Sequence, residues 1–472
     1  MWLPAPLLLA AALVAPPSPG ASAAEGLAAD PLLTQMVGEA LAHSPEYAQA
    51  KAELSAEEER VPQAGALPDP TVTLGIQNDG FRGLEIGTME TSFWQVMVTQ
   101  PLPWPGKRVR REEAARAQAS TVEERMDKIR LATAAEVERA YVDLLLVRGQ
   151  AELLVRLEGL WKEAEATVRS RYEVGTVPQS DLLRAQLERT RLMQRRIALE
   201  LAERSAVETL NRLRGHPLDE PIATERRLAE VALPPLPPLE EVVADAEERS
   251  PDLALARRGV LAAERKVLSA RQERWPDFTV SAGIMPRGHL DPMWTASVGI
   301  AIPIFSRKDR AVAEEESRKS AGERGEDATR QVVDLRAQER YAALEAARKT
   351  LALYTEALLV QSDAAVKSTL AQYRVGKVPF AAVLEVMRGL VADEAGHLQV
   401  VADGERIVIA MQEVSLEAPA GMSGGGGFTG GTVPGTSGGA MASGGPAGGA
   451  SSGGGEGAPA AGGSSGGTSS GM

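Results

Sequence analysis

The amino-acid sequence predicts a mixed α and β protein in which one plan, a helix, two strands and a long helical hairpin, occurs twice in tandem. Three observations support this prediction. Four sequence blocks recur in the same order at a spacing of about 200 residues. Two pairs of segments alternate apolar and polar side chains with the period of a strand. Residues 107–172 and 308–373 keep a helical apolar period and contain no proline.

The repeated blocks identify a tandem duplication. The proline-rich “LPPLPP” at 233–238 stands between the two copies as a natural linker. The matched pairs are “HSPEYAQAKAEL” (43–54) and “RSPDLALARRGV” (249–260), “LPDPTVTLGI” (67–76) and “WPDFTVSAGI” (275–284), “VTQPLPWPGKR” (98–108) and “IAIPIFSRKDR” (300–310), and “RYEVGTVPQSDLL” (171–183) and “QYRVGKVPFAAVL” (372–384).

The two ends of the chain differ in composition from the duplicated part. The first residues hold an apolar run, then prolines, then small residues, which is the order of an export signal, although no Lys or Arg precedes the run. The last residues are almost entirely Gly, Ser, Ala, Thr and Pro, which bury too little apolar area to fold. The expected segments are a signal peptide at 1–24, a first repeat at 32–232, a linker at 233–239, a second repeat at 240–415 and a disordered tail at 416–472.

Helices are expected at the start of each copy and in its hairpin. In the first copy a helix is expected at 32–62, and after the breaker “PLPWPG” a second helix restarts at Lys107 and continues to about Tyr172. Its apolar residues keep the spacings of three and four that form a coiled-coil seam. The return helices are expected at 179–214 and 380–413. A helix of about 66 residues is on the order of 100 Å long, deeper than an ordinary globular core.

The strands are expected at 71–77 and 93–102, and around 278–284 and 294–302 in the second copy. Each has one apolar face with aromatic residues at its edge and one face of small or polar side chains. This pattern fits a half-buried soluble sheet, or a membrane barrel with lipid outside and water inside. Strands of about 10 residues match a tilted bilayer crossing. Four strands do not close a barrel around a channel, so the barrel interpretation requires several chains, and three chains would supply twelve strands.

Composition excludes several classes of function. The chain has 472 residues and a net charge of −13, and without a basic cluster this balance argues against a nucleic-acid partner. The absence of cysteine excludes disulfides, thiol nucleophiles, iron–sulfur clusters and cysteine-type zinc sites, and also the acylated first residue of a bacterial lipoprotein. No mature segment has the apolar length of a transmembrane helix, so the chain is a soluble exported protein or crosses a membrane as strands.

The duplicated plan, the motifs “RYEVGTVPQSDLL” and “QYRVGKVPF”, and the pair “LPDP” and “PLPWPGKR” together resemble the TolC-like outer membrane efflux proteins. The resemblance covers about residues 32–413. It implies a homotrimer whose twelve strands form a barrel in outer membrane lipid and whose twelve long helices form a tunnel in the periplasm. It also implies a passive exit duct that serves an inner-membrane efflux pump through a periplasmic adaptor, or membrane fusion protein.

Within this family, “LPDP” and “PWPGKR” are most similar to the branch that works with heavy-metal resistance pumps. Heavy-metal ions or small toxic compounds are therefore the expected cargo. Many members carry a lipidated cysteine, and this chain departs from them. The alternative function is a soluble periplasmic coiled-coil adaptor or scaffold, which would keep the long hairpins but does not need the alternating strands.

The turns “VGTVP” at 174–178 and “VGKVP” at 375–379 join the outgoing and returning helices of the two hairpins. Gly175 and Gly376 suit the left-handed position that closes a helix, and Pro178 and Pro379 stand where the next helix starts. A simple helix connection explains these residue types. The resemblance adds a function, because in the family these tips lie at the periplasmic entrance, where the adaptor docks.

The resemblance also implies a set of gate residues. In related proteins a carboxylate beyond the first tip bonds across the entrance to a tyrosine before the second tip glycine, and here these positions are Asp181 and Tyr373. An arginine often found in the second tip is replaced by Val378. Of two acidic positions lower in the entrance, Ala382 has lost its carboxylate and Glu385 keeps it. Three Glu385 side chains would form a ring that favours cations, although a solvated helix face explains Glu385 equally.

Catalytic, cofactor and metal sites are not expected. The four histidines, His43, His216, His289 and His397, are scattered and form no metal-binding motif. The segment “PRGHLDPMW” is expected to form the turn between the second pair of strands, where turn chemistry explains its residues. No nucleophile and base pair stands out, so the chain is not expected to be an enzyme.

Overall fold

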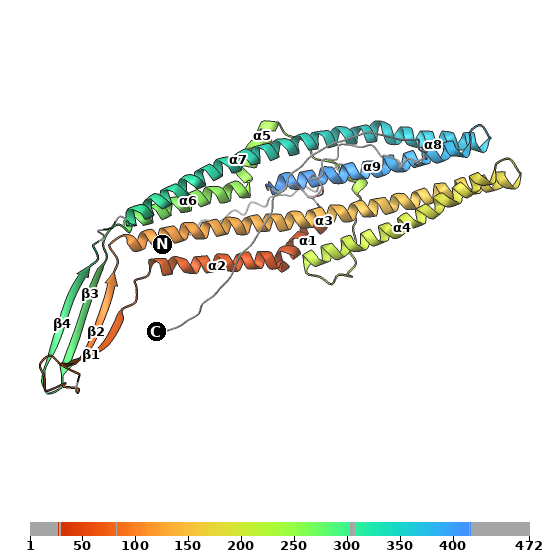
Figure 1. Cartoon of the computed structure of the whole chain (residues 1–472). Helices are drawn as coiled ribbons and strands as arrows, with labels where there is room; N and C mark the ends of the chain where they lie inside the picture. The colour runs from red at the N-terminus through yellow and green to blue at the C-terminus, as the bar shows by residue number, and fades with distance from the viewer. Residues whose placement is uncertain are drawn as a thin grey trace, which may run out of the picture. The chain divides into compact units, whose positions relative to one another are not determined.

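The computed structural model describes residues 27, 30–81, 83–302, 305, 307–414 and 416 of the chain. Figure 1 shows four strands at one end of the long helices and the tips of both helical hairpins at the other end. The expected signal peptide at 1–24 lies outside the described residues, as does the expected tail at 416–472 except for Leu416.

Both copies follow the expected order of a helical start, two strands and a long helical hairpin. The first copy contains α1 (Pro31–His43), α2 (Pro45–Gly65), β1 (Thr71–Gln77), β2 (Phe93–Leu102), α3 (Lys107–Glu173), α4 (Gln179–Arg214) and the short 3-10 helix η2 (Leu228–Glu230). The second contains α5 (Leu239–Arg249), α6 (Pro251–Gln272), β3 (Phe278–Arg287), β4 (Leu290–Ile300), α7 (Arg307–Leu353), the π-helical turn η3 (Tyr354–Leu358), α8 (Leu359–Arg374) and α9 (Phe380–Glu413).

The single helix expected at 32–62 is wrong, because each copy begins with two helices. Ser44 separates α1 from α2, and its hydroxyl accepts a hydrogen bond from the Tyr47 backbone N–H at 3.2 Å. The next residue is a proline, which disfavours the helical conformation of the residue before it. Ser250 separates α5 from α6 in the same way and accepts from the Leu253 N–H at 3.3 Å. The Ser-Pro pair in both repeated blocks therefore marks a break that the apolar period alone does not reveal.

The strands at 71–77 and 93–102 are confirmed. All neighbours in the sheet are antiparallel, in the order β1-β2-β3-β4, so the pair β2 and β3 joins the first copy to the second. The strands of the second copy are longer than expected, because Arg287 in β3 still pairs with Leu290 in β4. The segment “PRGHLDPMW” is thus mostly strand, with Gly288 (φ 67°) and His289 left for a tight turn.

The long helices pack side by side as antiparallel pairs. The predicted helices at 107–172, 179–214 and 380–413 are confirmed as α3, α4 and α9. α4 packs against α3, α3 packs against α9, and α9 packs against α7 and α8. The order across the layer is therefore α4, α3, α9 and then α7 with α8 (Figure 1). Helices α2 and α6 pack against α3 nearer the strands.

Two apolar clusters hold this layer together. The first surrounds Tyr141 and Leu144 of α3 and includes residues of α1 and α9. The second lies nearer the hairpin tips, where Trp161 of α3 packs in one cluster with Phe380 and Met387 of α9. All five side chains are at most 4 % exposed, so the tips are anchored by burial of apolar area as well as by their turns.

The helix expected over 308–373 is interrupted by the π-helical turn η3, whereas α3 runs for 67 residues without a break. A Cβ atom added to Gly396 of α9 would lie 2.5 Å from the Tyr354 hydroxyl oxygen. The first side chain of η3 therefore occupies space that only a glycine leaves open on the facing helix. A π turn shifts the register of the residues that follow it, and apolar periodicity does not predict such a shift.

Candidate functional site

One face of the sheet is apolar and exposed. Leu74, Trp294 and Val298 are 75, 79 and 74 % exposed, respectively, although a sheet in a water-soluble fold would bury such a face. The strand register places the apolar residues of all four strands opposite one another on this face. Its exposed members are Val72, Leu74, Ile76, Trp94, Val96, Val98, Leu102, Val280, Ile284, Trp294, Val298 and Ile300. We call this set the apolar sheet face.

The opposite face carries small and polar side chains. The Thr99 and Ser281 hydroxyls share a hydrogen bond at 2.9 Å across the junction of the two copies. A Cβ atom on Gly283 would lie 2.8 Å from the Val96 carbonyl oxygen, so a larger residue does not fit there without a shift of the backbone. The alternation of apolar and polar side chains predicted from the sequence is therefore present in the folded sheet. The face opposite the apolar sheet face is polar enough to contact water.

Aromatic residues mark both ends of the sheet. Trp94 pairs with Ile76 and Trp294 pairs with Ile284 at the end far from the helices. At the helical end Trp104 stacks on Trp275, with ring centroids 5.1 Å apart. Aromatic belts at the two ends of an outward apolar band are typical of strands that cross a bilayer, where amphipathic rings sit at the headgroup level.

The helical end of the sheet also holds a buried lysine. Lys107, the first residue of α3, is fully buried, and its Nζ atom lies 2.6 Å from Asp277 Oδ1 and 3.2 Å from Glu273 Oε2. Asp277 Oδ1 also accepts a hydrogen bond from the Trp104 backbone N–H at 2.9 Å. These contacts tie the start of α3 in the first copy to the start of β3 in the second. Sequence reasoning used “PLPWPGKR” as a helix breaker and a family motif and “WPDFTVSAGI” as a repeat block, and it missed this link.

The two hairpin tips, residues 174–178 and 375–379, have the same backbone geometry. Gly175 and Gly376 adopt φ angles of 72° and 76°, which confirms the left-handed positions expected from the sequence. In the first tip the Gly175 and Thr176 N–H groups donate to the carbonyls of residues 172 and 171, and the second tip repeats this pattern one copy later. Pro178 and Pro379 are the N-cap residues of α4 and α9.

The gate residues expected from the sequence lie near these tips. Tyr373 is 1 % exposed and packs against Phe380 with ring centroids 5.6 Å apart. Asp181 is half-buried in the first turn of α4. Burial raises the pKa of the Tyr373 phenol, and the Asp181 charge raises it further. Within the described part of one chain the Tyr373 hydroxyl has no hydrogen-bond partner, so the expected bond to Asp181 is not formed there. Glu385 is exposed on α9.

The residue that touches Tyr373 instead is Arg171, which sequence reasoning did not single out. Its guanidinium lies over the Tyr373 ring, 4.8 Å from the centroid, and its Nη1 atom donates a hydrogen bond to the Tyr373 carbonyl oxygen at 2.7 Å. Arg171 belongs to the motif “RYEVG” of the first tip, and Tyr373 belongs to the second. The signal in the sequence was the mismatch within the repeat, since the counterpart of Arg171 in the second copy is Gln372.

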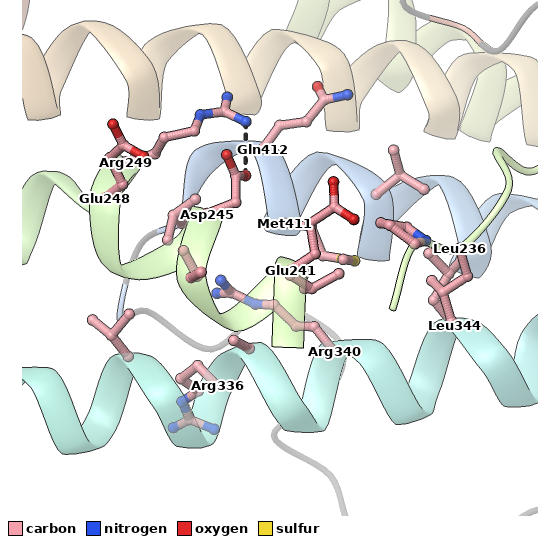
Figure 2. Close-up of a pocket in the computed structure, with 18 of the residues that line it drawn as sticks. Leu236, Glu241, Asp245, Glu248, Arg249, Arg336, Arg340, Leu344, Met411 and Gln412 are labelled. Atoms are coloured by element: carbon pink, nitrogen blue, oxygen red, sulfur yellow. Dashed lines mark hydrogen bonds and ion pairs between the residues drawn. The ribbon is translucent and has the colours of Figure 1, made fainter. Parts of the chain in front are cut away.

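A cleft of about 600 Å³ opens between α5, α7, α9 and the proline-rich linker. Figure 2 shows its charged residues, among them Asp245 and Arg249, which form an ion pair at 3.1 Å on α5. Arg340 of α7 is 5 % exposed, and burial lowers the pKa of its guanidinium. Apolar side chains such as Leu344 and Met411 complete the wall. The cleft has the volume of a small-molecule site, but the ion pair between Asp245 and Arg249 joins two neighbours on one helix.

Among the described residues, no group of three or more His, Asp or Glu side chains could hold a metal ion. Of the helices that the structure describes, none combines the length and apolar character needed to cross a membrane.

Comparison with known proteins assigns the family. The model of the outer membrane efflux protein family matches residues 36–216 and 242–412, which are the two copies. No curated protein sequence matches the chain.

Solved structures share the fold at low sequence identity. The outer-membrane channel OprN has a TM-score of 0.70 and 18 % identity, with 83 % of this chain and 92 % of that chain covered. CusC, studied for folding and transmembrane channel formation, has a TM-score of 0.70 and 16 % identity over 84 and 95 % of the two chains. The open-state MtrE channel of Neisseria gonorrhoeae has a TM-score of 0.67 and 16 % identity over 81 and 89 %. The family model, which matches both copies, shows that the chain belongs to the outer membrane efflux protein family.

Proposed function

We propose that three copies of the chain form the exit duct of a tripartite efflux system. Each copy contributes its four strands to one closed barrel, with the apolar sheet face toward lipid and the polar face toward the channel. The long helices continue the channel through the periplasm, where a periplasmic adaptor and an inner-membrane pump meet it at the hairpin tips.

The apolar sheet face is the observation that carries this proposal. It is exposed in the single chain and has aromatic belts at both ends, so it has the pattern of a surface that meets lipid. β1 and β4 are the outer strands of the four-stranded sheet, so each has one edge that pairs with no other described strand. Unpaired edges favour pairing with another strand, and β4 against β1 of the next copy would satisfy both edges and close the ring.

The outer helices support the same assembly. Leu187, Ile197 and Leu201 on α4 are 49, 68 and 68 % exposed, and they follow one side of that helix. At the other flank of the layer, Leu353 and Val360 are 62 and 63 % exposed. Packing α4 of one copy against α7 and α8 of the next would bury both apolar surfaces and close the helical tunnel.

The tips are the proposed entrance and docking surface. The two tips share one backbone turn, built by Gly175 and Pro178 in the first tip and by Gly376 and Pro379 in the second. An adaptor with two similar binding surfaces would dock on this pair of turns. Three copies of Glu385 would make a cation-favouring ring at this entrance. We keep Asp181 and Tyr373 as gate residues, Asp181 through its charge and Tyr373 through the packing of its ring. Heavy-metal ions or small toxic compounds remain the predicted cargo.

Paired substitutions on the two sheet faces test the channel. Val98→Arg, on the apolar sheet face, is expected to cost about 2 to 4 kcal/mol near the middle of the bilayer, whereas Thr99→Arg on the polar face is milder. The measurements are the mass of the purified particle in detergent by light scattering and its conductance in planar bilayers. A folded monomer recovered from the soluble periplasm, with equal tolerance of both substitutions, would support the alternative of a soluble adaptor or scaffold.

A further inference from the structure

Arg171 connects the two hairpin tips of one chain through both its backbone and its side chain. Its carbonyl oxygen accepts hydrogen bonds from the Thr176 N–H at 2.9 Å and the Thr176 hydroxyl at 2.8 Å, which close the first tip. Its guanidinium donates to the Tyr373 carbonyl oxygen at 2.7 Å, the same atom that accepts the Gly376 N–H at 3.0 Å. The guanidinium therefore joins the hydrogen bond that closes the second tip, as a cation at the C-terminal end of a helix.

The fit around this side chain is close. A Cβ atom on Gly376 would lie 3.3 Å from the Arg171 Nη2 atom, so the backbone of the second tip passes directly beside the guanidinium. The planar group also covers the ring of Tyr373, which is 1 % exposed. A flat cation with several donors can contact a ring and a carbonyl at once, and an ammonium group does so less well.

Three other ion pairs between the two hairpins, in the part nearer the tips, are more exposed than this contact. They also join an arginine to a glutamate across the seam between the first hairpin and the second. The arginine side chains in them are 52 to 64 % exposed, so solvent and salt weaken these pairs. The pairs are Glu163 with Arg374, Glu188 with Arg388, and Arg156 with Glu394.

We propose that Arg171 is the latch that holds the second hairpin against the first when the entrance is closed, and that opening requires its guanidinium to leave Tyr373. This inference rests on the proposed function of the tips as an entrance. The latch belongs to one copy of the repeat, because Gln372 has no guanidinium to extend toward the first tip. The two hairpins therefore have different roles. The first hairpin supplies the latch residue Arg171, and the second hairpin supplies its binding partner Tyr373.

Spin labels test the latch directly, because the chain contains no cysteine. Val174→Cys and Val375→Cys, at exposed and equivalent positions, place one label on each tip. Excess unlabelled protein dilutes the labels, so that distances within one chain dominate the pulsed electron resonance signal. Arg171→Gln, which gives the first copy the residue of the second, is expected to broaden the distance distribution and shift it to longer distances. Arg169→Gln is the matched control, since Arg169 pairs with Glu165 of its own helix at 3.0 Å.

Conductance gives the second measurement. Loss of the latch is expected to raise the resting open probability in planar bilayers about tenfold, which corresponds to about 1.4 kcal/mol, while Arg169→Gln leaves it unchanged. Arg171→Lys, which keeps the charge but not the planar group, is expected to restore only part of the closure. A check of trimer mass and melting temperature separates this effect from misfolding.

The outcomes separate the latch from the channel. Tips that keep their native distance distribution in a folded Arg171→Gln protein would overturn the latch. Tips that separate in a particle with no conductance in any variant would support the latch and contradict the channel proposal.

Discussion

The two hairpin tips have the same backbone and almost opposite surroundings. The equivalent tyrosines Tyr172 and Tyr373 stand at the same position of the repeat, yet the first is 40 % exposed and the second 1 %. After the turn, Phe380 covers Tyr373, whereas the first copy has the exposed Gln179 at that position. The duplication therefore preserved the backbone of the turn. The helices packed against each hairpin determine which of its side chains are buried.

The return helices differ for the same reason. α9 lies between α3 and α7, whereas α4 lies at the flank of the layer. Glu405 of α9 is 3 % exposed, but Arg204, its counterpart in the repeat on α4, has a side chain that is 77 % exposed. A duplicated chain that packs as one layer thus gives one copy a central helix and the other a peripheral one. Three matched pairs of substitutions test how far this difference extends.

The largest effect is expected where each long helix starts. Lys107→Met removes a fully buried ammonium that pairs with Asp277 and Glu273, and it leaves both carboxylates without that partner. We expect the free energy of unfolding to fall by about 3 kcal/mol. Arg307, the first residue of α7, is exposed, so Arg307→Met should change stability by less than about 0.5 kcal/mol.

Denaturant-induced loss of the folded particle in detergent measures both variants. Equal losses in the free energy of unfolding would mean that the first residues of α3 and α7 contribute equally to stability. The contrast between the two copies would then be limited to the tips. A stable Lys107→Met protein would show that solvent around the carboxylates compensates for the lost ammonium.

Local patterns predicted the elements well, because strands and long helices follow from periodicity and turn residues. Strand alternation placed β1 and β2 at their observed ends, and glycine and proline placed both tips. What the sequence did not reveal depends on contacts across about 200 residues of chain, such as the partners of Lys107 and the position of Arg171 on Tyr373. Local patterns do not specify which of two similar helices becomes central, so the burial of Tyr373 was not predictable either.

The central position of α9 predicts a pH-dependent stability. Burial raises the pKa of Glu405 from its ordinary value of 4.5 to about 7. The folded chain therefore binds this proton more tightly than the unfolded chain, so the stability it contributes is complete below pH 4.5 and is lost as the pH rises through about 7. Between pH 5 and pH 8 we expect a loss on the order of 2 kcal/mol.

Thermal unfolding at several pH values compares the wild type with Glu405→Gln, which should remove this part of the pH dependence and be the more stable of the two at pH 8. Glu385→Gln is the control on the same helix, because Glu385 is exposed and its removal should leave the dependence unchanged. If both variants keep the pH dependence of the wild-type stability, Glu405 is hydrated or paired in the assembled particle. The centre of α9 would then be more accessible to water than its burial in one chain indicates.

The smallest effect is expected at the tyrosine hydroxyls. Tyr373→Phe removes a buried hydroxyl that has no partner within the described part of one chain, while the ring under Arg171 and the carbonyl that accepts its hydrogen bond both remain. We expect a change in stability of less than about 1 kcal/mol and no change in resting conductance, because an unsatisfied hydroxyl contributes little when it is lost. Tyr172→Phe, at the exposed counterpart, should be equally silent. A rise in conductance with Tyr373→Phe alone, absent when Asp181 is already Asn, would show that the assembled entrance forms the hydrogen bond between Asp181 and Tyr373 that one chain does not. The two tips would then differ in a polar contact as well as in packing.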